Sequence, residues 1–227
     1  MKKIGLVGGI SWTSTMDYYK YINEGINEKL GGLNFAEMII YSLNFGDVQK
    51  LSWDNSFEIL YNACEKLKLS GVDAIVLGAN TAHLYADAIQ EKIQLPIIHI
   101  ATATALEIRK NGITKVGLLG TKFTMEMDFY RDKLEENDLE VIIPKSQETR
   151  DYIQHVVKEE LGKGIINPES KEKFIKTTKE LIEQGAQGIV LGCTEIPLLI
   201  NQQDITVPVF DTTKIHSRAI VEFALSN

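Results

Sequence analysis

The sequence predicts an α/β protein built from two similar halves, each with a mainly parallel sheet flanked by helices. Short apolar runs alternate with segments of helical periodicity, which is typical of parallel sheets with crossover helices. The second half also repeats landmarks of the first, because residues 115–120 echo residues 3–8 (115 − 3 = 112) and residues 207–210 echo residues 95–98 (207 − 95 = 112). We therefore expect two pseudo-symmetric domains, residues 1–111 and 112–227. An arrangement in which the last helix crosses back onto the first domain stays open.

The elements follow from apolar periodicity and from the glycines that interrupt it. In the first half we expect strands at residues 4–7, 38–41, 74–77 and 95–100, helices at residues 16–30, 57–67, 83–92 and 101–110, and a loop at residues 44–54. In the second half we expect strands at residues 115–120, 189–191 and 207–210, and a solvated helix around residues 171–179, where charges alternate at helical spacing.

Composition excludes several classes of function. The chain has 227 residues, 44% hydrophobic and 24% charged, with a net charge of −7. Nucleic acids and anionic membranes both need clustered cations, so we expect neither as a partner. The apolar run at the start is too short for a signal peptide, and no apolar stretch is long enough to span a membrane. Two cysteines distant in sequence then indicate reduced thiols and a cytoplasmic protein.

The stretch of residues 185–198 carries the strongest functional signal. An apolar strand ends in a turn at Gly192, which delivers Cys193, Thr194 and Glu195. Open α/β sheets bind ligands at the carboxyl ends of their strands, so Cys193 lies where chemistry is expected. Residues 75–78 repeat residues 189–192, and Ala79 therefore occupies in the first half the position that Cys193 holds in the second.

Two strand-end turns that face one another would flank a bound molecule from opposite sides. That arrangement suits racemisation or epimerisation, in which one group removes a proton and another returns it from the opposite face. A cysteine can serve as such an acid/base when its surroundings lower its pKa. The alternative for Cys193 is a small buried hydrophobe, and this is the interpretation that we favour for Cys64, which belongs to an apolar helical stripe.

The turns after the first strand of each half, at residues 8–12 and 120–124, are candidates for binding an anion. Backbone N–H groups and hydroxyls at a strand-to-helix turn form a natural cradle for a carboxylate, although either could be a simple turn. Neither turn matches the glycine motifs of nucleotide-binding proteins. Beside the two key positions, Asn80, Thr81 and Thr194 carry the donors that a carboxylate needs.

Histidines and metals contribute little to the prediction. A lone histidine is more often structural than catalytic, and only His83, one helical step after its turn, and His216, after the last strand, stand out. No histidine and cysteine have the spacing of zinc ligands, so we expect no metal site.

Five segments together resemble the aspartate/glutamate racemase family, in its branch similar to bacterial L-aspartate/glutamate-specific racemases. They are residues 4–15, 80–83, 120–131, 185–196 and 210–213, and the resemblance covers essentially the whole chain. It implies two pseudo-symmetric α/β domains, no pyridoxal phosphate or other cofactor, a homodimer, and two catalytic residues facing each other across the domain interface. Most members use two cysteines, and the branch closest to this chain can carry a threonine at the first position.

The chain departs from that pattern at Ala79, which can neither accept nor donate a proton. The alanine is either native to the gene or an engineered replacement. Some relatives have a lysine aimed at the distal carboxylate of the substrate, and the resemblance implies that Lys163 corresponds to it, within one residue of register.

The function that we predict is racemisation of aspartate, glutamate or a close analogue, with Cys193 as acid/base and Ala79 at the vacant partner position. The alternatives are a single-cysteine decarboxylase or lyase and a catalytically silent amino-acid-binding protein. The predicted substrate-binding residues are Ser11, Asn80, Thr81, Thr121, Thr124 and Thr194, and the predicted supporting residues are Trp12, His83, Lys163, Glu195 and His216.

Overall fold

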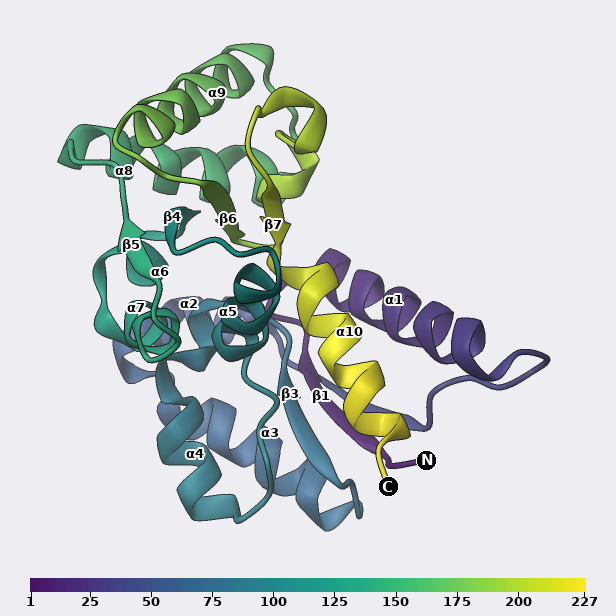
Figure 1. Ribbon diagram of the computed structural model, residues 1–227. Coiled ribbons are helices and arrows are strands. Elements are labelled where there is room, and N and C mark those ends of the chain that lie inside the picture. Colours follow the sequence, from purple (N-terminus) through teal and green to yellow (C-terminus); the bar gives the residue numbers. More distant parts are fainter. The chain divides into compact units, whose positions relative to one another are not determined.

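The computed structural model describes all 227 residues, and the chain divides into two compact units of mixed α and β structure (Figure 1). Unit 1 comprises residues 1–100 and 213–227, and unit 2 comprises residues 101–212. The α/β class predicted from the sequence, with parallel sheets flanked by helices, is confirmed. The first stretch of unit 1 ends at residue 100, which is 11 residues before the predicted domain boundary after residue 111 (111 − 100 = 11).

Unit 1 contains a parallel three-stranded sheet in the order β2-β1-β3. Its strands are β1 (Ile4–Gly8), β2 (Met38–Ser42) and β3 (Ala74–Leu77). Every residue of β1 and β3 is buried, whereas the edge strand β2 is partly exposed. Both faces of the central strands are covered by helices, which explains why their sequences are continuous apolar runs.

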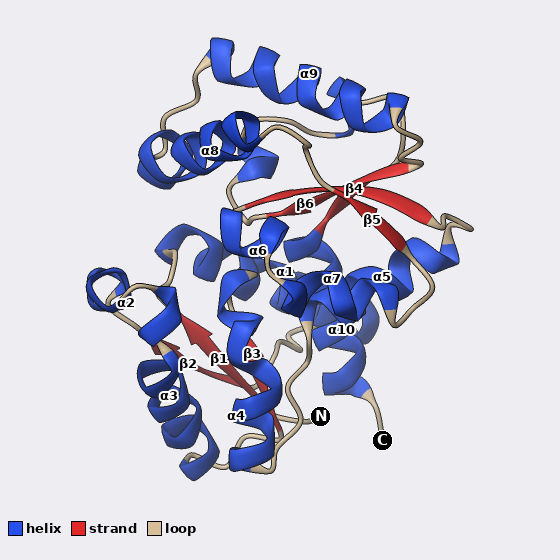
Figure 2. Cartoon of the chain, turned by 90° about the vertical axis from the view of Figure 1, so that its left-hand side faces the viewer, coloured by secondary structure: helices blue, strands red, loops and turns tan.

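Two pairs of helices cover the faces of this sheet. Side chains of α1 (Trp12–Leu30) and α10 (Thr212–Leu225) pack with those of β1 and β3 in one apolar cluster. On the other face, α3 (Phe57–Leu69) and α4 (Ala86–Ile93) form a second cluster that includes Cys64, so the structural interpretation of this cysteine agrees with its burial. Figure 2 shows α3 and α4 together on their side of the sheet.

Unit 2 contains a parallel four-stranded sheet in the order β5-β4-β6-β7. The strands are β4 (Lys115–Gly120), β5 (Glu140–Ile142), β6 (Gly188–Gly192) and β7 (Val209–Asp211). Residues of α8 (Gln147–His155) and α9 (Pro168–Glu183) pack on one face of β6. In Figure 2, α5 (Ile100–Lys110) and α7 (Asp128–Glu135) lie on the side of this sheet opposite to α9. The order β2-β1-β3 in unit 1 thus recurs as β5-β4-β6, as the repeat in the sequence predicts.

The predicted strand at residues 95–100 is wrong. This segment makes only one isolated bridge, between Ile97 and Ile75, and α5 begins at Ile100. The N–H of Ile75 donates to the carbonyl of Pro96 at 2.9 Å, and the N–H of Ile98 donates to the carbonyl of Ile75 at 3.0 Å. Proline has no N–H to extend the ladder, and the helix starts before further pairs can form.

The predicted loop at residues 44–54 is also wrong, because it contains α2 (Phe45–Leu51). Asn44 caps this helix by accepting a hydrogen bond from the N–H of Gly46 at 3.3 Å. A short capped helix was missed because Gly46 and the polar residues of the segment read as turn formers. The helix predicted to begin at Met16 begins at Trp12, since Ser11 is its N-cap.

Shorter helical segments complete the chain. α6 (Lys122–Glu126) follows β4, and Val156–Glu160 forms one π-helical turn after α8. Single 3₁₀ turns lie at Trp53–Asn55, Thr81–Tyr85, Leu161–Lys163, Ile196–Leu198 and Gln202–Asp204. The helix predicted at residues 83–92 is therefore a 3₁₀ segment followed by α4. None of the helices is both long enough and apolar enough to cross a membrane.

Candidate functional site

In unit 1 the turns that follow β1 and β3 lie side by side at the carboxyl end of the sheet. The N–H of Gly78 donates to the carbonyl of Val7 at 2.9 Å. A Cβ atom on Gly78 would lie 2.9 Å from that same carbonyl oxygen, and one on Gly8 would lie 2.6 Å from Cγ2 of Thr15. The sequence needs glycine at both turns because the backbones and Thr15 approach too closely for a side chain.

The turn after β1 presents the N-terminus of α1. Gly9 has a φ of 79°, and its N–H donates to Oγ1 of Thr15 at 2.9 Å. Thr15 Oγ1 in turn donates to the carbonyl of Ser11 at 2.8 Å, and Ser11 Oγ accepts from the N–H of Ser14 at 3.3 Å. The predicted residue Ser11 is therefore the N-cap of α1. Sequence reasoning missed Thr15, although its position four residues after the cap was a usable signal.

The turn after β3 places Ala79 at the edge of an apolar cluster. Ala79 is 9% exposed and is the most exposed of the buried residues in the cluster that α3 and α4 cover. Asn80, Thr81 and His83 follow it and are also buried. Trp12, the first residue of α1, is 69% exposed, in contrast to these buried side chains.

His83 is a buried neutral imidazole with both ring nitrogens engaged. Nδ1 lies 2.9 Å from the carbonyl oxygen of Ala79, and Nε2 lies 3.2 Å from the N–H of Ile100. A carbonyl only accepts and an N–H only donates, so Nδ1 carries the proton. Burial lowers the pKa of His83 to about 4, although the bond to Ala79 opposes the shift.

His216 is held in the same manner, deep inside unit 1. Its Nε2 donates to the carbonyl of Ile98 at 2.7 Å, and its Nδ1 accepts from the hydroxyl of Tyr18 at 2.8 Å. Burial lowers its pKa to about 3, with the nearby His83 adding to the shift. Both rings therefore remain neutral near neutral pH, and the predicted supporting role of the two histidines stays a prediction.

In unit 2 the turns after β4 and β6 repeat the arrangement. Gly120 and Gly192 are paired in the sheet, and a Cβ atom on Gly120 would lie 2.8 Å from the carbonyl oxygen of Gly192. Thr121 caps α6 by accepting from the N–H of Thr124 at 3.3 Å, and the two threonine hydroxyls are 3.1 Å apart. The structure therefore brings the predicted residues Thr121 and Thr124 together beside the strand end that leads to Cys193.

Cys193 and Thr194 share one carboxylate. The thiol of Cys193 donates to Oε2 of Glu195 at 2.9 Å, and the hydroxyl of Thr194 donates to the same oxygen at 2.8 Å. The turn at residues 193–196 follows β6 directly, since the N–H of Ile196 donates to the carbonyl of Cys193 at 3.2 Å. Glu195 thus has a direct contact with the predicted acid/base.

The surroundings of Cys193 keep its thiol protonated. Burial raises the pKa of Cys193 well above its usual value, and the negative charge of Glu195 and the hydrogen bond to it raise the pKa further. The sequence-based expectation of a lowered pKa is therefore not met in this state. Burial also raises the pKa of Cys64, to about 12, and no carboxylate accompanies that thiol.

Lys163 lies in the 3₁₀ segment Leu161–Lys163. Its Nζ forms an ion pair with Glu159 at 2.7 Å, and its side chain is 59% exposed. This places Lys163 in a surface ion pair, and its predicted contact with a distal carboxylate stays a prediction.

A crevice of about 390 Å³ lies between α1 and α10 in unit 1. It contains none of the predicted site residues, and acidic and basic side chains alternate along it: Glu24, Glu28, Lys29, Lys214, Arg218 and Glu222. Charges of both signs in equal number are typical of a solvated helix–helix groove, and we assign this crevice no part in catalysis.

Each unit therefore presents a glycine turn, a capped helix and a second turn at the carboxyl ends of parallel strands. Open α/β sheets bind their ligands at this end. The family model for Asp/Glu/Hydantoin racemase matches residues 7–220, and the chain belongs to this family. The resemblance inferred from the five sequence segments is confirmed, and so is the class of enzyme, an isomerase of the amino-acid racemase type.

Several relatives match the chain over its full length. It is 26% identical to the broad specificity amino-acid racemase RacX of Bacillus subtilis (strain 168) over 231 residues, which cover 98% of each protein. A crystal structure of an aspartate racemase homologue from Pyrococcus horikoshii OT3 is 41% identical, with a TM-score of 0.85 and full coverage of both chains. A structure from Yersinia pestis, described as a candidate Asp/Glu racemase, is 45% identical over both full chains, with a TM-score of 0.92.

Proposed function

We propose that this protein is a cofactor-independent racemase of aspartate, glutamate or a close analogue, and that Cys193 is one of its acid/base groups. Membership of the Asp/Glu/Hydantoin racemase family supports the reaction type, and the names of the relatives support the substrate class. The contact between the Cys193 thiol and the Glu195 carboxylate is the observation that carries the proposal. Because family members work without pyridoxal phosphate, we propose the same for this chain. We also propose a cytoplasmic location.

The pair can exchange a proton in either direction. When the thiol passes its proton to Glu195, the resulting thiolate can abstract the α proton of the substrate, and the electron pair of the broken C–H bond moves into the adjacent carboxylate. When the thiol keeps its proton, it can instead protonate the same carbanion. A raised resting pKa of Cys193 makes the second role available at once and makes the first depend on Glu195.

The hydroxyl-rich turns supply candidates for holding the substrate. The turn at Ser11 begins a helix of 19 residues, whose N-terminal N–H groups attract a carboxylate. In unit 2, the hydroxyls of Thr121 and Thr124 lie 3.1 Å apart, and the hydroxyl of Thr194 shares the Glu195 carboxylate with Cys193. We propose that these groups, with Asn80 and Thr81, bind the carboxylates and the amino group of the substrate, and that Lys163 reaches a distal carboxylate.

Ala79 is the point at which the proposal divides. Racemisation by two groups on opposite faces needs a second acid/base, and the methyl group of Ala79 cannot act as one. A one-base decarboxylase or lyase, in which Cys193 only protonates a carbanion, is the second candidate function because it needs no group at residue 79. The apolar cluster around Ala79 supports this candidate, because apolar surroundings disfavour an ionised acid/base at residue 79.

Exchange of the α proton with solvent deuterium separates the candidates. We expect L-aspartate or L-glutamate in D₂O to lose its α-proton signal in proton NMR in the presence of the protein, and the Cys193→Ser variant to be inactive, because a serine hydroxyl is a far weaker acid than a thiol. Inversion, followed by circular dichroism, marks a racemase, and release of carbon dioxide from a malonate-type acid marks a decarboxylase. A Cys193→Ser protein that exchanges as fast as its parent would refute the role of Cys193.

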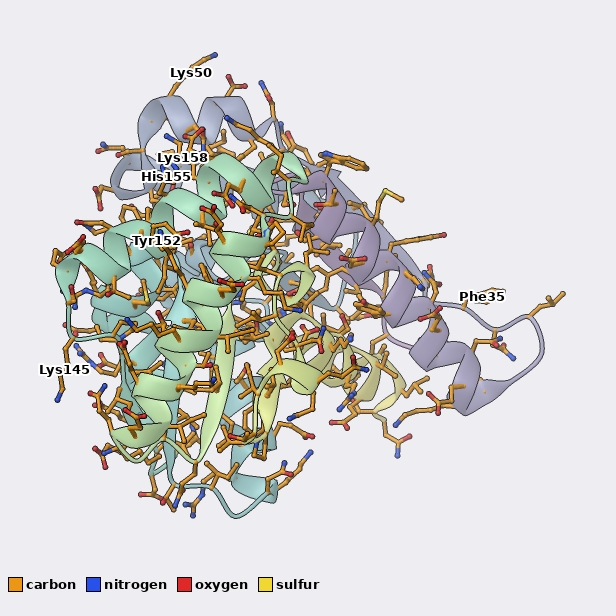
Figure 3. The ribbon with its side chains drawn as sticks, turned by 90° about the horizontal axis from the view of Figure 1, so that it is seen from above. Phe35, Lys50, Lys145, Tyr152, His155 and Lys158 are labelled. Carbon is orange, nitrogen blue, oxygen red and sulfur yellow. The ribbon has the colours of Figure 1, made fainter.

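We further propose that the protein forms a homodimer through the flank of α1 and the edge strand β2. Large exposed apolar side chains follow one flank of α1, the loop after it and β2: Trp12, Met16, Tyr19, Leu30, Leu33, Phe35 and Ile40. The loop folds onto this flank, since Asn23 Oδ1 accepts from the N–H of Ala36 at 3.0 Å, and Figure 3 shows Phe35 at its projecting end. Such patches mark interfaces, and an unpaired edge strand suits pairing with its own copy about a two-fold axis.

The dimer is tested by charge insertion into this surface. We expect the parent to sediment as a dimer in analytical ultracentrifugation, and the double variant Met16→Glu, Tyr19→Glu to sediment as a monomer, because two buried carboxylates would lack partners. Leu69→Glu is the matched control, since Leu69 is 82% exposed at the end of α3. A monomeric parent, or a control that dissociates equally, would count against this surface.

A further inference from the structure

Three histidines gather inside unit 1, and the proposed chemistry uses none of their protons. The ring of His83 lies 4.7 Å from that of His99 and 5.6 Å from that of His216, between centroids. His83 and His216 are buried. Burying polar rings is costly unless they make hydrogen bonds, so the bonds of this cluster indicate what it holds in place.

His83 joins the turn at residue 79 to the point where the chain leaves unit 1. One ring nitrogen donates to the carbonyl of Ala79 and the other accepts from the N–H of Ile100, as described above. Ile100 is the last residue of the first stretch of unit 1. A single rigid ring therefore spans two backbone segments that are 21 residues apart in sequence (100 − 79 = 21).

His216 braces the same outgoing segment from a second side. It donates to the carbonyl of Ile98, whose own N–H donates to Ile75 in β3. The hydroxyl of Tyr18 fixes the other nitrogen of His216. The outgoing segment is thus tied both to the sheet and to α10, which makes it a firm anchor for His83.

We propose that His83 is a positioning residue, which sets the orientation of the turn at residues 79–81 by donating from Nδ1 to the carbonyl of Ala79. The proposal rests on the proposed function in one respect, that this turn meets the substrate. His83 touches neither substrate nor reacting atoms and acts only through the backbone of residue 79. The bond to Ala79 is the part that matters for catalysis, whereas the bond to Ile100 matters for anchoring and stability.

Two variants separate these bonds. Asparagine places its amide nitrogen near the position of Nδ1, so His83→Asn keeps the donor to Ala79 and loses the acceptor for Ile100. Glutamine reaches the position of Nε2, so His83→Gln keeps the acceptor for Ile100 and loses the donor to Ala79. Each variant breaks one buried hydrogen bond, so both should lose similar stability, and only His83→Gln releases the turn. Tyr18→Phe is the control, because it removes a bond to His216 and leaves both bonds of His83 in place.

The first measurement is the rate of α-proton exchange on L-aspartate and L-glutamate. We expect kcat to fall about a hundredfold in His83→Gln, the cost of a small misplacement of a substrate-holding group. His83→Asn and Tyr18→Phe should keep most of the parent kcat. Equal losses in His83→Asn and His83→Gln, or no loss in either, would show that His83 has a structural role alone.

The second measurement does not depend on activity. Ala79-Asn80 is the only Ala-Asn pair in the sequence, so labelling alanine carbonyls with ¹³C and asparagine amides with ¹⁵N gives a single peak that reports on the carbonyl of Ala79. We expect this peak to move in His83→Gln and to stay near its parent position in His83→Asn. If the peak stays in place in both variants, the proposed role of His83 is overturned. If the peak moves in His83→Gln but the parent shows no exchange activity, only the proposed function is overturned.

Discussion

At the residue scale, the proposed function makes residue 79 the position that distinguishes a two-base racemase from a one-base enzyme. Cys193 has its carboxylate partner, yet the corresponding turn of unit 1 offers a methyl group. Ala79 keeps 9% exposure at the edge of its cluster, so we expect a side chain larger by one or two heavy atoms to extend away from the cluster. Under the proposed function, a proton-carrying side chain at residue 79 would supply the second acid/base that alanine cannot.

We therefore predict that Ala79→Cys or Ala79→Thr raises the rate of racemisation by about a hundredfold to ten-thousandfold, the range for one general acid/base group. The measurement is the circular dichroism of L- and D-aspartate and L- and D-glutamate with the variant and its parent. Ala79→Ser serves to compare a hydroxyl with a thiol of similar size. A folded variant that binds these amino acids without racemising them would favour the decarboxylase.

Glu195 should control the ionisation of Cys193. Its charge raises the pKa of the thiol, so Glu195→Gln should let the thiolate appear at lower pH than in the parent. The ultraviolet absorbance of the thiolate, followed against pH and corrected with Cys193→Ser, measures this shift. Cys64, with a pKa of about 12, adds little below that pH. Near neutral pH the same variant should lose exchange activity, because burial still holds the pKa of the thiol high and the thiol then lacks its proton acceptor.

At the element scale, the close approach of paired turns is what builds each half of the site. A Cβ atom on Gly120 would lie 2.8 Å from the carbonyl oxygen of Gly192 and 3.1 Å from the side chain of Thr124. Backbone atoms on a buried strand cannot move aside cheaply, so even one methyl group forces β4 and β6 apart.

Gly120→Ala should accordingly lower the free energy of unfolding by about 1–3 kcal/mol, the usual cost of overpacking. Gly46→Ala is the control, because its added methyl group meets only the side chain of Asn44, at 3.4 Å, inside α2. There alanine should gain up to about 1 kcal/mol of helix propensity. Urea unfolding of both variants and the parent checks the difference, and equal stability of Gly120→Ala and the parent would contradict the close approach.

At the scale of the whole molecule, the buried histidines make stability depend on pH. The pKa values of His83 and His216 fall from 6.5 in the unfolded chain to about 4 and about 3 in the folded protein. Between those limits the unfolded state binds more protons than the folded state. The stability from the neutral rings is therefore complete above pH 6.5 and is lost as the pH falls towards 4 and then 3.

We predict a decline of up to about 1.4 kcal/mol per pH unit for each histidine across that window. Urea unfolding at several pH values measures the slope. His83→Asn should flatten it, since one titrating group is gone. The same slope in His83→Asn and its parent would mean that His83 is charged in the folded protein.

The sequence by itself determined the class of fold, the central strands of both sheets and the paired glycine turns, because burial on both faces requires continuous apolar runs and a sharp strand end requires glycine. Family membership followed from the same segments. These features are local, and each depends on residues close together in the chain.

Only the tertiary structure decided what depends on distant residues. The segment around Pro96 reads as a strand, yet it stops at one bridge because Pro96 has no N–H to extend the ladder and α5 begins at Ile100. The state of Cys193 depends on burial and on the direction of Glu195, and the neutrality of His83 depends on carbonyl and N–H groups from separate segments. Burial and hydrogen-bond partners are properties of the folded chain, which is why residue type and spacing identified these side chains but did not fix their protonation.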